Sequence, residues 1–89
     1  MIKQPWVAYG LFLSGLGKIV GETEWSVDIM YTEGQNYPME TWNKKYIKRF
    51  DTPLELARFL VDHSNDSFDY IMELLKRNYP SDFIYKEKK

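Results

Sequence analysis

The stretch TPLELARFLVDH, residues 52–63, divides the sequence into two halves of different character. Thr52 is suited to cap a helix, Pro53 to occupy its first position and Glu55 to complete a capping box. We therefore predict a helix that ends near His63. It is apolar around most of its circumference, which is typical of a helix buried on two sides, here by a sheet and by a second helix.

The second helix is predicted after a short polar connection. It begins at Asp66 or Ser67 and ends near Asn78, because Pro80 cannot continue a helix. Apolar residues recur in it at helical spacing: Phe68, Ile71, Met72, Leu75 and Tyr79. A last strand or turn is expected at residues 83–85.

The half before Thr52 has the pattern of a β-meander. Residues 6–13 (WVAYGLFL) lack a polar face, which predicts a strand covered on both sides. Residues 24–32 alternate cleanly, which predicts a half-buried strand. Its inward side chains are expected to be Trp25, Val27, Ile29 and Tyr31, with Met30 as an exception to the alternation.

Three glycines separate these strands. Gly15, Gly17 and Gly21 predict a turn and a short return segment at residues 18–20. Their spacing superficially resembles a dinucleotide-binding fingerprint, but the phosphate site needs a helix start directly after the glycines. The acidic, strand-like residues 22–25 follow instead, so we interpret the glycines as turn residues.

Two further segments are predicted to extend the sheet. Residues 35–42 can form an edge strand, where Pro38 is tolerated. Residues 44–50 fit both a helical stripe and a strand, and we predict a strand because residues 51–53 then form a short turn into the helix. The fold class is therefore α+β: a small antiparallel β-meander of three or four strands, followed by an αα-hairpin packed on one face. Residues 1–85 form a single domain, and residues 86–89 form a frayed charged tail.

Composition argues against several functions. The chain has no cysteine and one histidine, so we expect no catalytic residues, no metal site and no cofactor, and a cytoplasmic location. Its longest apolar run, residues 6–13, is far shorter than the roughly 20 residues that span a bilayer, so no membrane partner is expected. His63 is expected to be partly buried near the end of its helix.

One arrangement of side chains resembles a calcium-binding loop. The residues with this spacing are Asp62, Ser64, Asp66 and Glu73. Such a loop also requires glycine at its sixth position, where this chain has Ser67, and the last ligand, Glu73, would lie inside the second helix. We therefore predict an inter-helix turn rather than a calcium site.

The candidate binding segment is residues 42–50, in which basic and aromatic side chains alternate. Residues 44–50 carry a charge of +4 and lie between two blocks, 19–43 and 51–75, that each carry −5. The proposed binding residues are Trp42, Lys44, Lys45, Tyr46, Lys48 and Arg49.

Protein binding is the leading functional hypothesis. Trp, Tyr and Arg dominate interface hot spots, and the aromatic content is high at 17%. We expect a small non-enzymatic accessory protein, an inhibitor or adaptor of the kind that phages and mobile elements encode, and a homodimer is compatible with the sequence. Single-stranded nucleic-acid binding through residues 42–50 is an alternative, because bases stack on aromatic rings beside cations. A second alternative is small-molecule binding in an aromatic pocket between sheet and helices.

Overall fold

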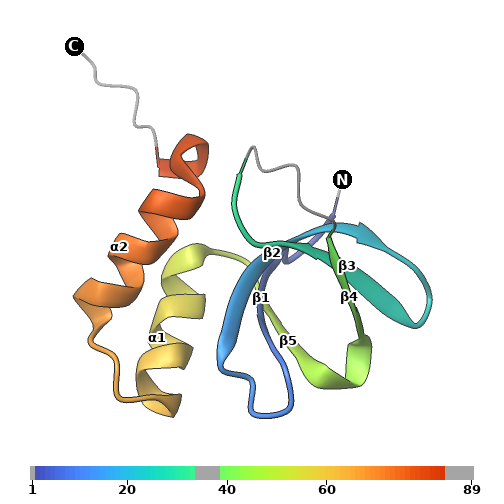
Figure 1. The fold of residues 1–89 in the computed structure, drawn as a ribbon, viewed down its shortest axis with the longest axis horizontal. Coiled ribbons are helices and arrows are strands. Elements are labelled where there is room, and N and C mark those ends of the chain that lie inside the picture. Colours follow the sequence, from blue (N-terminus) through green and yellow to red (C-terminus); the bar gives the residue numbers. More distant parts are fainter. Residues whose placement is uncertain (1, 34–38, 84–89) are drawn as a thin grey trace.

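The computed structural model describes residues 2–33 and 39–83, which form a curved antiparallel sheet with two helices on one side (Figure 1). The predicted α+β meander followed by a helical hairpin is confirmed, and the sheet has five strands. The strands are β1 (Trp6–Tyr9), β2 (Gly15–Glu22), β3 (Ser26–Met30), β4 (Glu40–Asn43) and β5 (Ile47–Phe50). The helices are α1 (Pro53–His63), α2 (Phe68–Asn78) and two short 3-10 helices, η1 (Lys44–Tyr46) and η2 (Pro80–Phe83).

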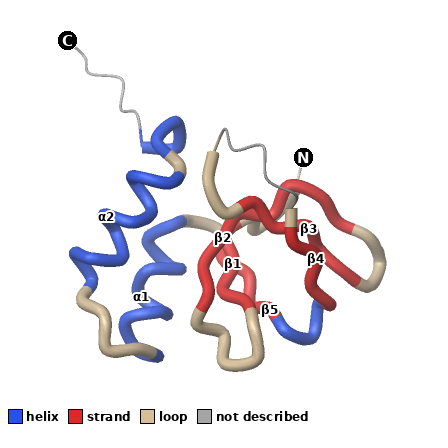
Figure 2. Tube along the Cα trace, viewed as in Figure 1, coloured by secondary structure: helices blue, strands red, loops and turns tan. Residues whose placement is uncertain are grey.

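The sheet curls because its two edge strands are joined directly. The strand order is β4-β3-β2-β1-β5, so the last strand returns to pair with the first. The edges of a flat five-stranded sheet would lie about 19 Å apart. The three residues of η1 join these edges and rise only about 6 Å (Figure 2). The sheet is therefore bent into a partly open barrel.

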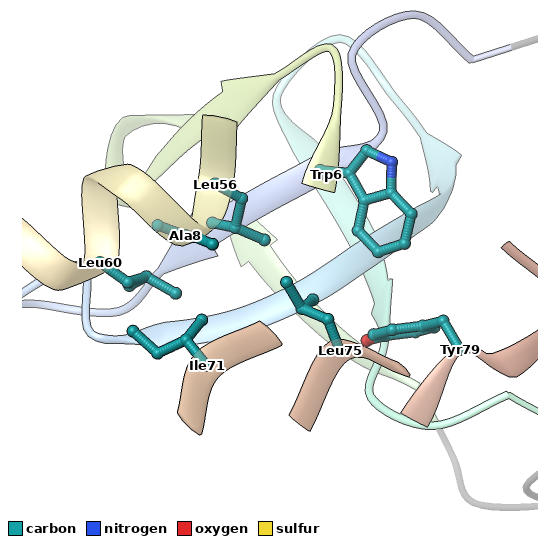
Figure 3. Close-up of a cluster of buried hydrophobic side chains, with 8 residues drawn as sticks. Trp6, Ala8, Leu56, Leu60, Ile71, Leu75 and Tyr79 are labelled. Atoms are coloured by element: carbon teal, nitrogen blue, oxygen red, sulfur yellow. The ribbon is translucent and has the colours of Figure 1, made fainter. Parts of the chain in front are cut away.

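Side chains of β1 alternate between two cores, which confirms that this strand is covered on both faces. Inside the barrel lies a buried cluster of Val7, Ile19, Val27 and Ile29. On the outer face, Trp6 and Ala8 pack against the helices (Figure 3). The helical members of this outer core are Leu56, Ala57, Leu60, Ile71, Leu75 and Tyr79.

Both predicted helix starts are confirmed. The Thr52 hydroxyl accepts a hydrogen bond from the Glu55 N–H (3.2 Å), and the Glu55 carboxylate accepts one from the Asp51 N–H (3.1 Å). Ser67 caps α2 by accepting a hydrogen bond from the Tyr70 N–H (3.1 Å). As predicted, α1 packs against both the sheet and α2.

The predicted first strand is too long. β1 ends at Tyr9, because Gly10 (φ 106°) and Leu13 (φ 53°) turn the chain through the left-handed region. The interpretation of the three glycines as turn residues is also wrong, since Gly15, Gly17 and Gly21 all lie within β2.

Packing explains two of these glycines. A Cβ atom on Gly15 would lie 2.6 Å from Cζ of Tyr9, whose ring covers this position. A Cβ atom on Gly17 would lie 2.3 Å from Cγ2 of Ile29. The absent side chains therefore make room for an aromatic ring and for a core isoleucine inside the barrel.

The alternation predicted for residues 24–32 holds for Val27 and Ile29 but fails at Trp25. Trp25 lies in the turn before β3 and is 70% exposed. Met30 leaves the inward pattern because its side chain packs against the outer core. Its carbonyl oxygen accepts a hydrogen bond from the Tyr79 hydroxyl (2.6 Å).

The remaining predicted segments are partly confirmed. β4 is an edge strand, although it begins at Glu40, and Pro38 lies outside the described residues. Residues 44–46 form η1 instead of strand, and only residues 47–50 belong to β5. At the C-terminus, Phe83 ends η2, while residues 84–89 lie outside the described part of the chain.

Candidate functional site

The structure divides the predicted binding residues among three environments. The reason is that η1 separates β4 from β5 and that neighbouring side chains on a strand point to opposite faces. These six side chains therefore do not gather on a single face. Lys44 and Arg49 lie at a salt-bridge cluster, and Trp42 and Tyr46 lie in a band of rings. Lys45 and Lys48 lie over the rings of Tyr46 and Phe50.

Glu22 neutralises two of the four cations. The Arg49 guanidinium donates to both carboxylate oxygens (2.9 and 3.1 Å), and Lys44 Nζ lies 2.8 Å away. Hydrogen bonds from Arg49 and then Lys44 lower the pKa of Glu22 to about 2. Arg49 also donates to the carbonyl oxygens of Lys3 (2.6 Å) and Gln4 (3.3 Å). Its role is to fasten the N-terminal segment to the barrel.

A shallow, open hollow of about 480 Å³ lies at this cluster. Its walls are Ile2, Lys3, Gln4, Glu22 and Arg49, and the Glu22 and Arg49 side chains among them already bond to each other. The space between sheet and helices, where the second alternative places a ligand pocket, is filled by the buried outer core.

A band of four half-buried rings borders the open edge of the barrel. Ring centroids are 5.6 Å apart for Tyr31 and Tyr9, 5.7 Å for Tyr9 and Trp42, and 6.1 Å for Trp42 and Tyr46. The Glu40 carboxylate accepts hydrogen bonds from the Tyr31 hydroxyl and from the Trp42 indole N–H (3.0 Å). Burial, aided by the charge of Glu40, raises the pKa of Tyr9 to about 12. The rings are thus held by one another and by a carboxylate.

Of the four cations in residues 42–50, Lys45 and Lys48 stay accessible. Both residues are exposed, and neither has a carboxylate within 4.0 Å in residues 2–33 and 39–83. Lys45 Nζ lies 5.4 Å from the centroid of the Tyr46 ring, and Lys48 Nζ lies 5.7 Å from that of Phe50. Their charges are available to a partner.

The β1–β2 loop carries a feature that the sequence analysis missed. Leu11 and Phe12, called the apolar tip below, are 73% and 83% exposed. The loop is tied down by a hydrogen bond from Leu13 N–H to Gly10 O (3.2 Å) and by one from Gly10 N–H to Tyr46 O (3.0 Å). The second bond places the loop beside η1. In the sequence, Gly10 could have indicated this exposed loop, because it interrupts an otherwise continuous apolar run.

His63 differs from expectation because it is exposed. Its ring stacks on Phe59 (centroids 3.9 Å apart), and Nδ1 lies 3.0 Å from the Phe59 carbonyl oxygen. Within the described residues, no three His, Asp or Glu side chains come together as a metal-binding group. Nor is any helix in that part of the chain long and apolar enough to cross a membrane.

Comparison of the chain with protein-family models, with curated proteins and with solved structures found no match. The function is therefore inferred from the geometry of the apolar tip and its neighbours.

Proposed function

We propose that this chain is a non-enzymatic accessory protein of the cytoplasm that binds another protein through the apolar tip and the adjacent cations Lys45 and Lys48. The observation that carries the proposal is the pair of neighbouring large apolar side chains, Leu11 and Phe12, exposed on a loop that the fold holds in place. Large exposed apolar groups rimmed by polar residues mark interaction sites.

The energetics favour such a contact. Burying each of these side chains in a partner contributes about 1.5–3 kcal/mol. The loop is already ordered by its two backbone hydrogen bonds, so binding loses less conformational entropy than it would for a flexible loop. Lys45 and Lys48 would steer the protein toward an acidic rim around the partner's apolar pocket.

Nucleic-acid binding through residues 42–50 stays a weaker hypothesis. Only two of its four cations lack a carboxylate partner among the described residues, and Trp42 is packed between Tyr9 and Tyr46. A base could stack on Trp42 only after this ring band opened. Small-molecule binding has similarly little support, since the outer core fills the expected pocket.

The test is affinity capture with the immobilised protein, compared between the natural sequence and Phe12→Asp. Met39→Asp is the matched control, because Met39 is also an exposed apolar residue (54%) but precedes β4, away from the tip. We expect a protein that is retained by the natural sequence and by the control, and is lost with Phe12→Asp. Purified captured protein should then bind with the same dependence in calorimetry.

The outcomes separate the hypotheses. Equal capture by all three proteins would reject the apolar tip as the contact. Tight binding of a single-stranded oligonucleotide that weakens with salt and depends on Trp42 would favour the nucleic-acid alternative instead.

A further inference from the structure

Three rings of the aromatic band meet around one carboxylate. Tyr9 contacts Tyr31 and Trp42, with ring centroids 5.6 and 5.7 Å apart and ring planes inclined by 43° and 49°. The Tyr31 hydroxyl and the Trp42 indole N–H both donate to Oε1 of Glu40. The two rings that flank Tyr9 therefore converge on the same oxygen atom. These four side chains are called the ring–carboxylate cluster below.

The fold holds the three rings in place. All three pack against the buried cluster inside the barrel. Tyr9 is fixed further by Gly15, since a Cβ atom at that position would lie within 2.9 Å of three atoms of the Tyr9 ring. Each ring is only half-buried, so part of it remains exposed. A ligand would therefore meet rings that are already ordered, and binding would lose little conformational entropy.

Glu40 brings a negative charge that the described residues leave uncompensated. The residue is exposed, and no cation in residues 2–33 and 39–83 lies within 4.0 Å of its carboxylate. Among the same residues, both hydrogen bonds to this carboxylate go to Oε1, and Oε2 accepts none. Aromatic faces and a carboxylate oxygen both attract a positive group.

From this arrangement we infer that the ring–carboxylate cluster binds a methylated lysine side chain of a protein partner. The methyl groups of the ammonium would contact the rings, and a remaining N–H would donate to Oε2 of Glu40. Unlike a nucleobase, an ammonium group is a compact charge that can reach this exposed oxygen without separating the rings. The half-exposed rings suit a side chain carried by a larger partner better than a free amine, which needs an enclosing pocket.

This site goes beyond the proposed function, because it uses other side chains than the apolar tip. The two contacts also differ in charge. Lys45 and Lys48 favour acidic groups on a partner, whereas Glu40 favours a basic group.

The first experiment titrates ¹⁵N-labelled protein with Nα-acetyl-dimethyllysine methylamide and follows the tryptophan indole N–H signals by NMR. We expect the Trp42 signal to shift and to saturate at roughly millimolar concentration, as is usual for a ligand with few contacts. Two signals serve as internal controls and should not move: Trp25 is 70% exposed in the turn before β3, and Trp6 is buried in the outer core.

Two analogues of the probe separate charge from apolar contact. The norleucine analogue keeps an apolar chain but has no charge, so we expect it to bind at least about fivefold more weakly. Unmodified lysine keeps the charge but offers no methyl groups to the rings, so it should also bind more weakly than the dimethylated form.

Variants test the carboxylate and the rings. Glu40→Gln keeps an oxygen acceptor for Tyr31 and Trp42 but removes the charge, and should weaken binding about two- to fivefold. Glu24→Gln is the matched control, because Glu24 is an exposed carboxylate next to the exposed Trp25, and it should change nothing. Tyr31→Leu removes one ring and should weaken binding about two- to tenfold. Circular dichroism melting checks that each variant is folded.

Several results would overturn the inference. These are a Trp42 signal that does not saturate, equal binding of the norleucine analogue or of unmodified lysine, and a parallel shift of Trp25. Full binding by Glu40→Gln would also overturn it. Because none of these measurements involves Phe12, protein capture that depends on Phe12 would still support the proposed function after such a failure.

Discussion

Tyr79 links the helical hairpin to the sheet, and its hydroxyl group allows this link to be measured. The side chain is fully buried, and its ring meets Trp6 edge to face at 5.2 Å. Its hydroxyl donates a hydrogen bond of 2.6 Å to the Met30 carbonyl oxygen, which joins α2 to β3 across 49 residues of chain.

Tyr79→Phe should lower the free energy of unfolding by about 1–3 kcal/mol. The substitution keeps the ring and opens no cavity, so the loss comes from a partly buried carbonyl group deprived of its donor. In a domain of this size each kcal/mol corresponds to a fall in Tm of about 4–8 °C. The matched control is Tyr70→Phe, because Tyr70 is 52% exposed, and we expect it to change stability by less than about 0.5 kcal/mol.

The assay is urea unfolding followed by circular dichroism. If the free energy of unfolding falls with urea concentration at the same slope in both proteins, only the stability has changed. A loss for Tyr79→Phe no larger than that for Tyr70→Phe would refute the argument. A pH series adds a second check. Burial raises the pKa of Tyr79 above its ordinary value of 10.0, so the folded state retains a proton that the unfolded state releases. Stability should therefore fall above about pH 10, and less steeply in the Phe variant.

Three further predictions concern the helix start, the barrel interior and the salt-bridge cluster. Thr52→Ala should cost about 0.5–2 kcal/mol in chemical denaturation, because the Glu55 N–H loses its acceptor, and a negligible change would contradict the capping role. Gly17→Ala should cost roughly 1–3 kcal/mol, since its Cβ would meet a core isoleucine at 2.3 Å, whereas Gly21→Ala should cost less because it meets a carboxylate that can move. The ion pairs lower the pKa of Glu22 to about 2, so its contribution to stability is present above about pH 4.5 and is lost toward pH 2. Glu22→Gln should flatten the dependence of stability on pH in this range. A variant with the same pH dependence as the natural sequence would contradict the pairing.

Local signals in the sequence determined the helical half. The caps at Thr52 and Ser67 act within three residues, so no distant contact is needed to set where α1 and α2 begin. The apolar stripe of α2 likewise identified Ile71 and Leu75 as buried.

Signals in the strand half were more ambiguous, because extended segments gain their structure from partners far along the chain. Gly15 and Gly17 looked like turn residues, and only the approach of Tyr9 and Ile29 explains them as parts of a strand. Trp25 fitted the alternation of its neighbours, yet the turn into β3 exposes it.

The candidate site shows the same division. The sequence alone established which side chains are basic, acidic or aromatic, and it drew attention to residues 42–50. Only the tertiary structure decided that Lys44 and Arg49 are bound to Glu22, whereas Lys45 and Lys48 are exposed. The physical reason is that the pairing of β5 with β1 and the curl of the sheet set which side chains meet, and both depend on contacts between residues about 40 positions apart.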